Sequence, residues 1–125
     1  MITGLHHVSM KCGSPEALLR VKTFYVDLLG FQTVREWPEG LMLRCGSALL
    51  EIFTNGEGSR EKGALRHIAL AADDVDAIAA RVQAAGYEVF LGPKELLIPS
   101  EPPLSARIAF CRGPLGEEIE FFRER

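Results

Sequence analysis

Apolar and polar positions follow an order that occurs twice along the chain. Residues 5–11 alternate as a half-buried strand does, and residues 14–30 carry apolar side chains at helical spacing. Ser14 suits the N-cap of this helix, Pro15 its first turn and Gly30 the position after its end. The apolar face of the helix is predicted to consist of Leu18, Val21, Tyr25, Leu28 and Leu29. Three short strand-like runs follow, at 31–37, 41–46 and 48–53.

The same order returns in the second half. Residues 65–71 predict a strand, and residues 73–86 predict a helix with Asp73 or Asp74 as its cap and Gly86 after its end. The apolar face of this second helix is predicted from Val75, Ile78 and Val82. Three more strands are predicted at 87–91, 106–111 and 117–122. The pattern therefore predicts an α+β protein built from two βαβββ modules.

The module boundaries follow from the composition between the two repeats. Residues 54–64 are polar and rich in glycine without periodicity, which is typical of a linker. We therefore expect one domain over residues 1–125, with module 1 at about 1–53 and module 2 at about 65–125.

Module 2 is longer than module 1 between its helix and its last strand. The excess coincides with residues 92–104, whose second half holds Pro99, Pro102 and Pro103. Because proline discourages both helix and strand pairing, this segment is predicted to be an inserted loop. A long loop in a compact domain is often a lid, so we expect it to close over a ligand.

Aligning the repeats brings out four ionisable residues. His7 aligns with His67, and Glu51 aligns with Glu120, each within an otherwise apolar strand. A single histidine in such a strand is usually a hydrogen-bonded core residue, and a single glutamate is usually solvated. Two imidazoles and two carboxylates that recur in register instead predict a site for a divalent metal.

Two neighbouring residues compete for these roles. Glu118 lies on the same strand face as Glu120, but the two residues after Glu120 match those after Glu51, which favours Glu120. Strand alternation places His6 on the face opposite His7, so His6 is predicted to be a structural or surface residue.

Charge and cysteine content narrow the class of protein. A net charge of -3 provides no basic field for nucleic acid. The start of the sequence does not look like a signal peptide, and no apolar run is long enough to span a membrane. Three widely spaced cysteines suit free thiols in a reducing compartment, so we expect a cytoplasmic protein.

Together these segments resemble the vicinal oxygen chelate superfamily, which includes glyoxalase I (lactoylglutathione lyase), methylmalonyl-CoA epimerase, extradiol dioxygenases and bleomycin-resistance proteins. The resemblance is carried by HHVSM, FYVDLLGF, LLEIF, HIALAADDVD and GPLGEEIEFF, and it covers nearly the whole chain. It implies that the two modules form an open, curved, eight-stranded mixed sheet around a metal.

The resemblance also implies roles for single residues. His7, Glu51, His67 and Glu120 match the metal ligands, and the His, Glu, His, Glu set is similar to that of glyoxalase I. By the same resemblance Glu120 is the catalytic base, and the substrate-binding positions hold Lys11 and Asn55. Lys11 replaces the arginine usual in glyoxalase I, and a lysine cannot hold a carboxylate through two parallel hydrogen bonds.

The function implied is that of a lyase with one divalent metal ion per site. It would isomerise the hemithioacetal of a 2-oxoaldehyde and a thiol to a 2-hydroxyacyl thioester. Zinc or nickel is expected first, with cobalt or manganese as alternatives. Other activities open at this stage are acyl-CoA epimerisation, thiol transfer to an antibiotic and non-catalytic drug binding. The expected partners are a small-molecule thiol adduct and a second copy of the chain, in a homodimer whose sites lie between subunits.

Overall fold

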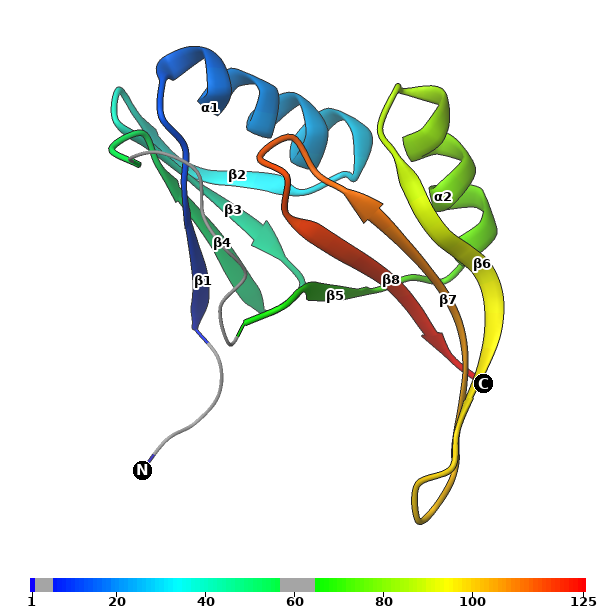
Figure 1. The fold of residues 1–125 in the computed structure, drawn as a ribbon. Helices are drawn as coiled ribbons and strands as arrows, with labels where there is room; N and C mark the ends of the chain where they lie inside the picture. Colours follow the sequence, from blue (N-terminus) through cyan, green and yellow to red (C-terminus); the bar gives the residue numbers. More distant parts are fainter. Residues whose placement is uncertain (2–5, 57–64) are drawn as a thin grey trace. The chain divides into compact units, whose positions relative to one another are not determined.

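The computed structural model describes residue 1 and residues 6–56 and 65–125 (Figure 1). The chain forms two compact units, Met1–Glu61 and Lys62–Arg125, and each has the element order βαβββ. The predicted α+β class with two such modules is confirmed. Residues 57–64, most of the predicted linker, lie outside the described residues. No helix in the described part of the chain is long and apolar enough to cross a membrane.

Module 1 is a four-stranded mixed sheet with one long helix. Its elements are β1 (His7–Lys11), α1 (Pro15–Lys22), the π-helical segment η1 (Thr23–Leu28), β2 (Gln32–Trp37), β3 (Gly40–Cys45) and β4 (Ala48–Phe53). The strand order is β1-β4-β3-β2, in which β1 is parallel to β4 and the other pairs are antiparallel.

The helix of module 1 begins as its sequence predicts. Ser14 is the N-cap, and its hydroxyl accepts a hydrogen bond from the Ala17 amide at 3.1 Å, which satisfies an amide that has no partner within the helix. Gly30, just beyond the helix, has φ 81°, a conformation that glycine adopts without a steric cost.

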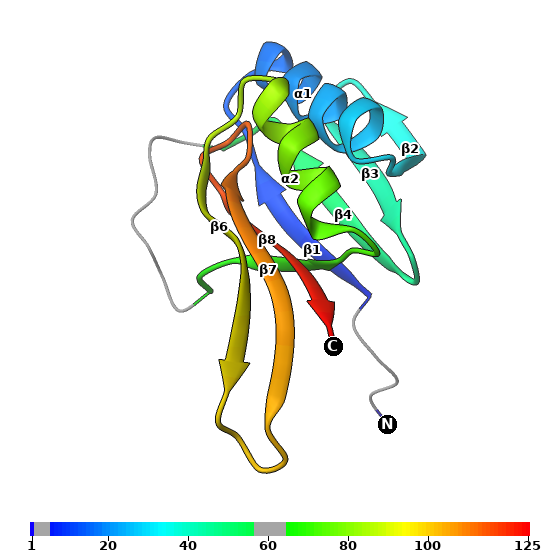
Figure 2. The same cartoon turned by 90° about the vertical axis from the view of Figure 1, so that its right-hand side faces the viewer.

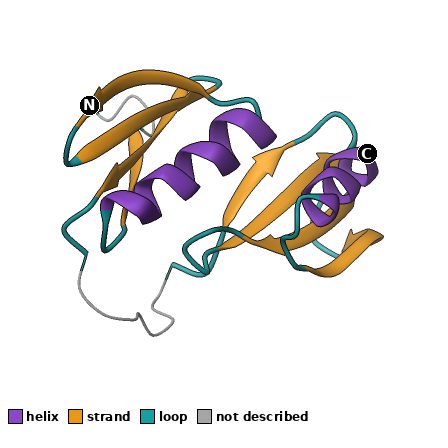
Figure 3. Cartoon of the chain, turned by 90° about the horizontal axis from the view of Figure 1, so that it is seen from above, coloured by secondary structure: helices purple, strands orange, loops and turns teal. Residues whose placement is uncertain are grey.

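A π-helical segment changes the buried face of this helix. The helix continues from α1 into η1 without a break (Figure 3). In η1 the Leu29 amide bonds to the Phe24 carbonyl oxygen, five residues back. Near the start of this segment the neighbouring Phe24 and Tyr25 are both buried. Of the predicted face, Val21 and Tyr25 are buried and Leu18, Leu28 and Leu29 are half-buried, and the prediction omitted Ala17 and Phe24, which are buried.

Module 2 repeats the topology with a regular α-helix. Its elements are β5 (Ile68–Ala71), α2 (Val75–Ala84), β6 (Val89–Ile98), β7 (Leu104–Arg112) and β8 (Glu118–Glu124), and the strand order is β5-β8-β7-β6. Asp74 is the N-cap of α2, and its carboxylate accepts a hydrogen bond from the Ala77 amide at 2.9 Å. On α2 the buried residues are Val75, Ala79 and Val82. Ala79 thus takes the place predicted for Ile78, which is half-buried.

The predicted loop at 92–104 is wrong. Residues up to Ile98 belong to β6, which pairs with β7 as far as Leu104, so the turn itself is short. The β6–β7 hairpin extends well beyond the end of β8 (Figure 2). Pro93 is accommodated because the β6–β7 register shifts between Leu91 and Lys94. The other three prolines fall in the turn, where no ladder hydrogen bond is lost.

Candidate metal centre

In module 1, strand pairing brings His7 and Glu51 together. The parallel register of β1 and β4 places His7 opposite Leu49 and Ser9 opposite Glu51. Leu49 and Glu51 project from the same strand face, so His7 and Glu51 are neighbours on it. His7 Nε2 lies 3.8 Å from Glu51 Oε1, and the two side chains are 40% and 16% exposed. This separation exceeds hydrogen-bond length, so it leaves the two atoms near each other without a direct bond.

Module 2 builds an equivalent pair from the equivalent strands. His67 directly precedes β5, and Ala69 lies opposite Glu120 in the parallel β5–β8 register. His67 Nε2 is 3.1 Å from Glu120 Oε2, with the two side chains 38% and 10% exposed. The sequence repeat is therefore also a repeat of register, because each glutamate lies two residues beyond the position opposite its histidine.

Each glutamate projects from the strand face opposite the module's core. In β4 it alternates with Leu50 and Ile52, and in β8 with Ile119 and Phe121, all four of which are buried. We call the face that carries the His–Glu pair the donor face. In module 1 it also bears Ser9, Lys11, Met42, Arg44 and Phe53. In module 2 it also bears Ala69, Phe110, Arg112, Glu118 and Phe122.

The immediate neighbours of the two glutamates are alike in size. Glu51 lies between Ser9 on the parallel strand and Met42 on the antiparallel strand. Glu120 lies between Ala69 and Phe110 in the same arrangement. Each carboxylate thus has a small side chain on one flank and a large apolar one on the other. The small residue leaves one side of the carboxylate uncovered by its neighbour in the sheet.

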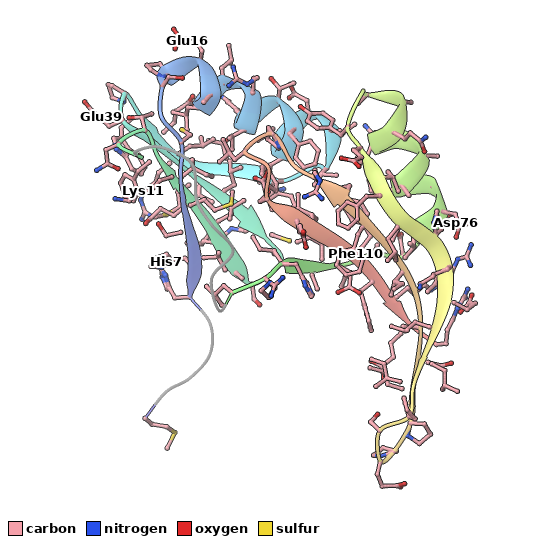
Figure 4. The ribbon with its side chains drawn as sticks, in the orientation of Figure 1. His7, Lys11, Glu16, Glu39, Asp76 and Phe110 are labelled. Carbon is pink, nitrogen blue, oxygen red and sulfur yellow. The ribbon has the colours of Figure 1, made fainter. Side chains whose placement is uncertain are left out.

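Aromatic rings line the donor face of module 2. The edge of the His67 ring meets Phe110 at a centroid distance of 5.2 Å, and Phe110 lies 5.8 Å from Phe90 (Figure 4 labels Phe110). The Arg112 guanidinium stacks over Phe90 at 4.7 Å. Phe110 was not among the predicted site residues. The alternation of 106–111, paired antiparallel to 117–122, would have placed it beside Glu120.

Glu118 and His6, the alternatives to Glu120 and His7 in the sequence, make different contacts from those two residues. Arg112 Nη1 lies 3.6 Å from Glu118 Oε1, so Glu118 faces a guanidinium whereas Glu120 faces His67. His6 lies just before β1, and its ring meets the His7 ring edge-on at 5.3 Å. His6 is exposed, as predicted for a surface residue, and it lies outside β1, so strand alternation does not fix the side of its ring.

The two predicted substrate-binding residues lie along the same edge of module 1. Lys11 ends β1 on the donor face, two alternations beyond His7 (Figure 4). Asn55 lies past the end of β4 and is exposed. Within the part of the chain that the structure describes, Lys11, Arg35 and Arg44 make no ion pair, and Arg35 Nη1 lies 3.4 Å from the Met42 sulfur. Among the described residues, the donor face of module 1 therefore presents cations that have no carboxylate partner.

In each module, the imidazole nitrogen and the carboxylate oxygen of the His–Glu pair are atoms that could bind a divalent metal. Among residues 6–56 and 65–125, no cluster of three or more His, Cys, Asp or Glu side chains forms. Imidazole nitrogen and carboxylate oxygen suit zinc and its neighbours in the first transition row. The 3.1 Å separation in module 2 matches a hydrogen bond, and it also matches adjacent donors that are each about 2.1 Å from one ion. Each module thus presents one imidazole and one carboxylate that could serve as two metal ligands.

Fold and site together define a class: two repeated βαβββ modules, each presenting an imidazole and a carboxylate from its sheet. A family model for the Glyoxalase/Bleomycin resistance protein/Dioxygenase superfamily matches residues 4–121, and the chain belongs to this superfamily. The predicted resemblance to the vicinal oxygen chelate proteins is thereby confirmed. None of the curated proteins matches the sequence significantly.

Solved structures share this fold along the whole chain. TnmS3, an antibiotic binding protein from Streptomyces sp. CB03234, is 27% identical with a TM-score of 0.74, over 99% of this chain and 98% of its own. A glyoxalase family protein from Enterococcus faecalis is 26% identical with a TM-score of 0.72, over 96% and 97%. Lactoylglutathione lyase from Agrobacterium tumefaciens is 19% identical with a TM-score of 0.67, over 98% and 94%, and at that identity it shows the fold alone.

Proposed function

We propose that this protein is a metal-dependent, glyoxalase I-like lyase. It would isomerise the hemithioacetal of a 2-oxoaldehyde and a thiol to a 2-hydroxyacyl thioester. The observation that carries the proposal is the repeated pairing of histidine with glutamate across the parallel strands of both modules. His7, Glu51, His67 and Glu120 would together hold one divalent ion, with zinc or nickel preferred to cobalt or manganese.

The bound ion would supply Lewis acidity, which stabilises negative charge on the substrate oxygens. A side chain of the protein would carry out the proton transfer. Glu120 would take the proton from the carbon beside the carbonyl and return it to the neighbouring carbon. Glu120 is 8% exposed, and its neighbour on the parallel strand, Ala69, has a small side chain. These features support Glu120 as the base.

The charge of module 1 suggests the class of thiol. Lys11, Arg35 and Arg44 are exposed cations around the His7–Glu51 pair. A thiol that carries carboxylates would be attracted to them. Glutathione belongs to this class, and Lys11 and Asn55 would contact its anionic part. The proposal is therefore an enzyme for an anionic thiol adduct.

A variant of the proposed base tests the function directly. Glu120→Gln keeps the shape of the side chain but cannot accept a proton, so turnover of the methylglyoxal–glutathione hemithioacetal should fall about 10²- to 10⁴-fold. Glu118→Gln is the matched control, because it makes the same change one alternation away on the same strand. Wild-type protein loaded with nickel or zinc that shows no turnover would refute the lyase, and equal losses in both variants would refute Glu120 as its base.

Drug binding without catalysis is the second candidate, and a specific observation favours it. The ring centroids of Trp37 and Phe53 lie 5.7 Å apart in module 1, and those of Phe90 and Phe110 lie 5.8 Å apart in module 2. Such rings are suited to stacking against a flat ligand. The similarity to an antibiotic binding protein points the same way. Protein that binds no nickel or zinc yet binds aromatic antibiotics would favour this function over the lyase.

A further inference from the structure

The histidine before the first donor contacts that donor on the side away from Glu51. His6 Nδ1 lies 3.0 Å from His7 Nδ1, which is hydrogen-bond distance, while His7 Nε2 faces Glu51. We infer that His6 is a positioning residue that holds the His7 ring in the tautomer with its proton on Nδ1. This leaves Nε2 free to bind a metal, and in that respect the inference rests on the proposed function.

The distances decide which ring nitrogen of His7 carries the proton. A proton on Nε2 would gain no hydrogen bond from Glu51, because that oxygen is 3.8 Å away. A proton on Nδ1 donates to His6 Nδ1 across 3.0 Å. His6 then keeps its own proton on Nε2, and its exposed position leaves that nitrogen to water. Both rings are satisfied in this arrangement. The hydrogen bond made by the remote nitrogen commonly fixes a metal-binding histidine.

The second module provides an internal contrast. At the position equivalent to His6 it has Arg66, and in the described part of the chain His67 Nδ1 has no hydrogen-bond partner. His67 Nε2 instead lies 3.1 Å from Glu120 Oε2, which favours a proton on Nε2 that donates to the carboxylate. The two donor histidines of the metal-free protein are therefore expected to be opposite tautomers, His7 with Nδ1–H and His67 with Nε2–H.

Nitrogen-15 NMR of the metal-free protein tests the inference without any metal or turnover. At about pH 8.5, where free imidazoles are neutral, long-range ¹H–¹⁵N spectra report which ring nitrogen carries the proton. His6→Ala should shift His7 away from the Nδ1–H form. His6→Asn should preserve it, because the amide oxygen provides an acceptor near the position of the lost nitrogen. Arg66→Ala is the matched control and should leave both tautomers unchanged.

Metal affinity provides the second measurement. Zinc binding by His6→Ala should be about 10-fold weaker than wild type, whereas His6→Asn and Arg66→Ala should remain near wild type. Wild-type His7 with its proton on Nε2, or a tautomer unchanged in His6→Ala, would overturn the inference. If the tautomers are as expected and no metal binds, the proposed function fails while the role of His6 in orienting His7 stands.

Discussion

Arg107 on β7 donates two hydrogen bonds to the carboxylate of Asp76 on α2. Its Nε donates to Oδ2 at 2.8 Å and its Nη2 donates to Oδ1 at 2.6 Å. Through this hydrogen-bonded pair, the first turn of α2 is joined to the strand beneath it (Figure 4 labels Asp76). The same guanidinium holds the pKa of Asp76 below its usual range, chiefly through these hydrogen bonds.

The lowered pKa of Asp76 predicts a pH-dependent loss of stability in Asp76→Asn. A carboxyl whose pKa is lower in the folded state stabilises the fold above its unfolded pKa of about 4, and this contribution is lost as pH falls through the folded pKa. Urea unfolding should therefore find Asp76→Asn less stable than wild type at pH 7, with the difference shrinking toward pH 3. Asp73→Asn, which removes a charge near the same helix end, is the control. An equal loss in both variants would show that charge alone matters.

Gly40→Ala should displace the single tryptophan. A Cβ at Gly40 would collide with the Trp37 indole, which covers this position, and it would lie 3.0 Å from the Ile52 carbonyl oxygen. The fold should lose about 1–3 kcal/mol, and tryptophan emission should move to longer wavelength as the ring becomes wetter. The control is the same change in a Trp37→Ala background, where most of the cost should disappear. A cost that persists there would place the strain in the backbone.

The three free cysteines should differ in reactivity toward a thiol reagent. Burial raises the pKa of Cys111 to about 12, helped by the negative charge of Glu117, and burial also raises the pKa of the half-buried Cys45. Because the thiolate is the reactive form, iodoacetamide at pH 8 should modify Cys45 slowly and leave the buried Cys12 and Cys111 intact. Peptide mapping of native and urea-unfolded protein checks this order. Rapid labelling of native Cys111 would contradict it.

Lys11→Met should weaken binding of an anionic thiol adduct selectively. The side chain is exposed, so the loss of its charge should raise KM about two- to fivefold for the glutathione adduct while leaving that of a neutral thiol adduct unchanged. Lys22→Met is the control, since Lys22 is already paired with Glu36 at 2.8 Å. Steady-state kinetics with both adducts give the comparison. An equal rise in KM for both adducts would mean that Lys11 does not distinguish an anionic thiol from a neutral one.

The proposed homodimer predicts complementation between two inactive variants. If each site takes His7 and Glu51 from one subunit and His67 and Glu120 from the other, a mixed dimer of His7→Ala and Glu120→Ala contains one intact site. Co-refolding the two variants should therefore restore activity, whereas refolding each alone should not. Mixing that restores nothing, although mass spectrometry detects the mixed dimer, would show that each site is built within one chain.

Sequence alternation was sufficient to predict the strands of the donor pairs, because each strand has one buried face. Buried Leu50 and Ile52 fix the side on which Glu51 emerges, and the repeat transfers this logic to Glu120. Two features were beyond such reasoning. The π-helical turn departs from the 3.6-residue period that predicted the buried face around Phe24. The extension of β6 past Pro93 depends on a shift of register against β7, which is a property of the pair.

The contact between His6 and His7 was missed for a related reason. A pattern of alternation holds only inside a strand, and His6 lies one residue outside it. The position of the His6 ring depends on the backbone conformation just before β1, which strand alternation does not predict. The sequence therefore predicted that each histidine lies near its glutamate, but it did not predict the contact between the two histidine rings.

Both donor pairs span the parallel pairings β1–β4 and β5–β8, while every other described pairing is antiparallel. His7 and Glu51 are 44 positions apart, and His67 and Glu120 are 53 apart. Closing such loops costs more entropy than forming the short hairpins, so the hairpins should form first. During synthesis, the first pair can assemble once β4 has left the ribosome, but the second must wait for β8, whose Glu120 lies 69 positions after Glu51. The His–Glu pair of module 1 can therefore form well before the pair of module 2.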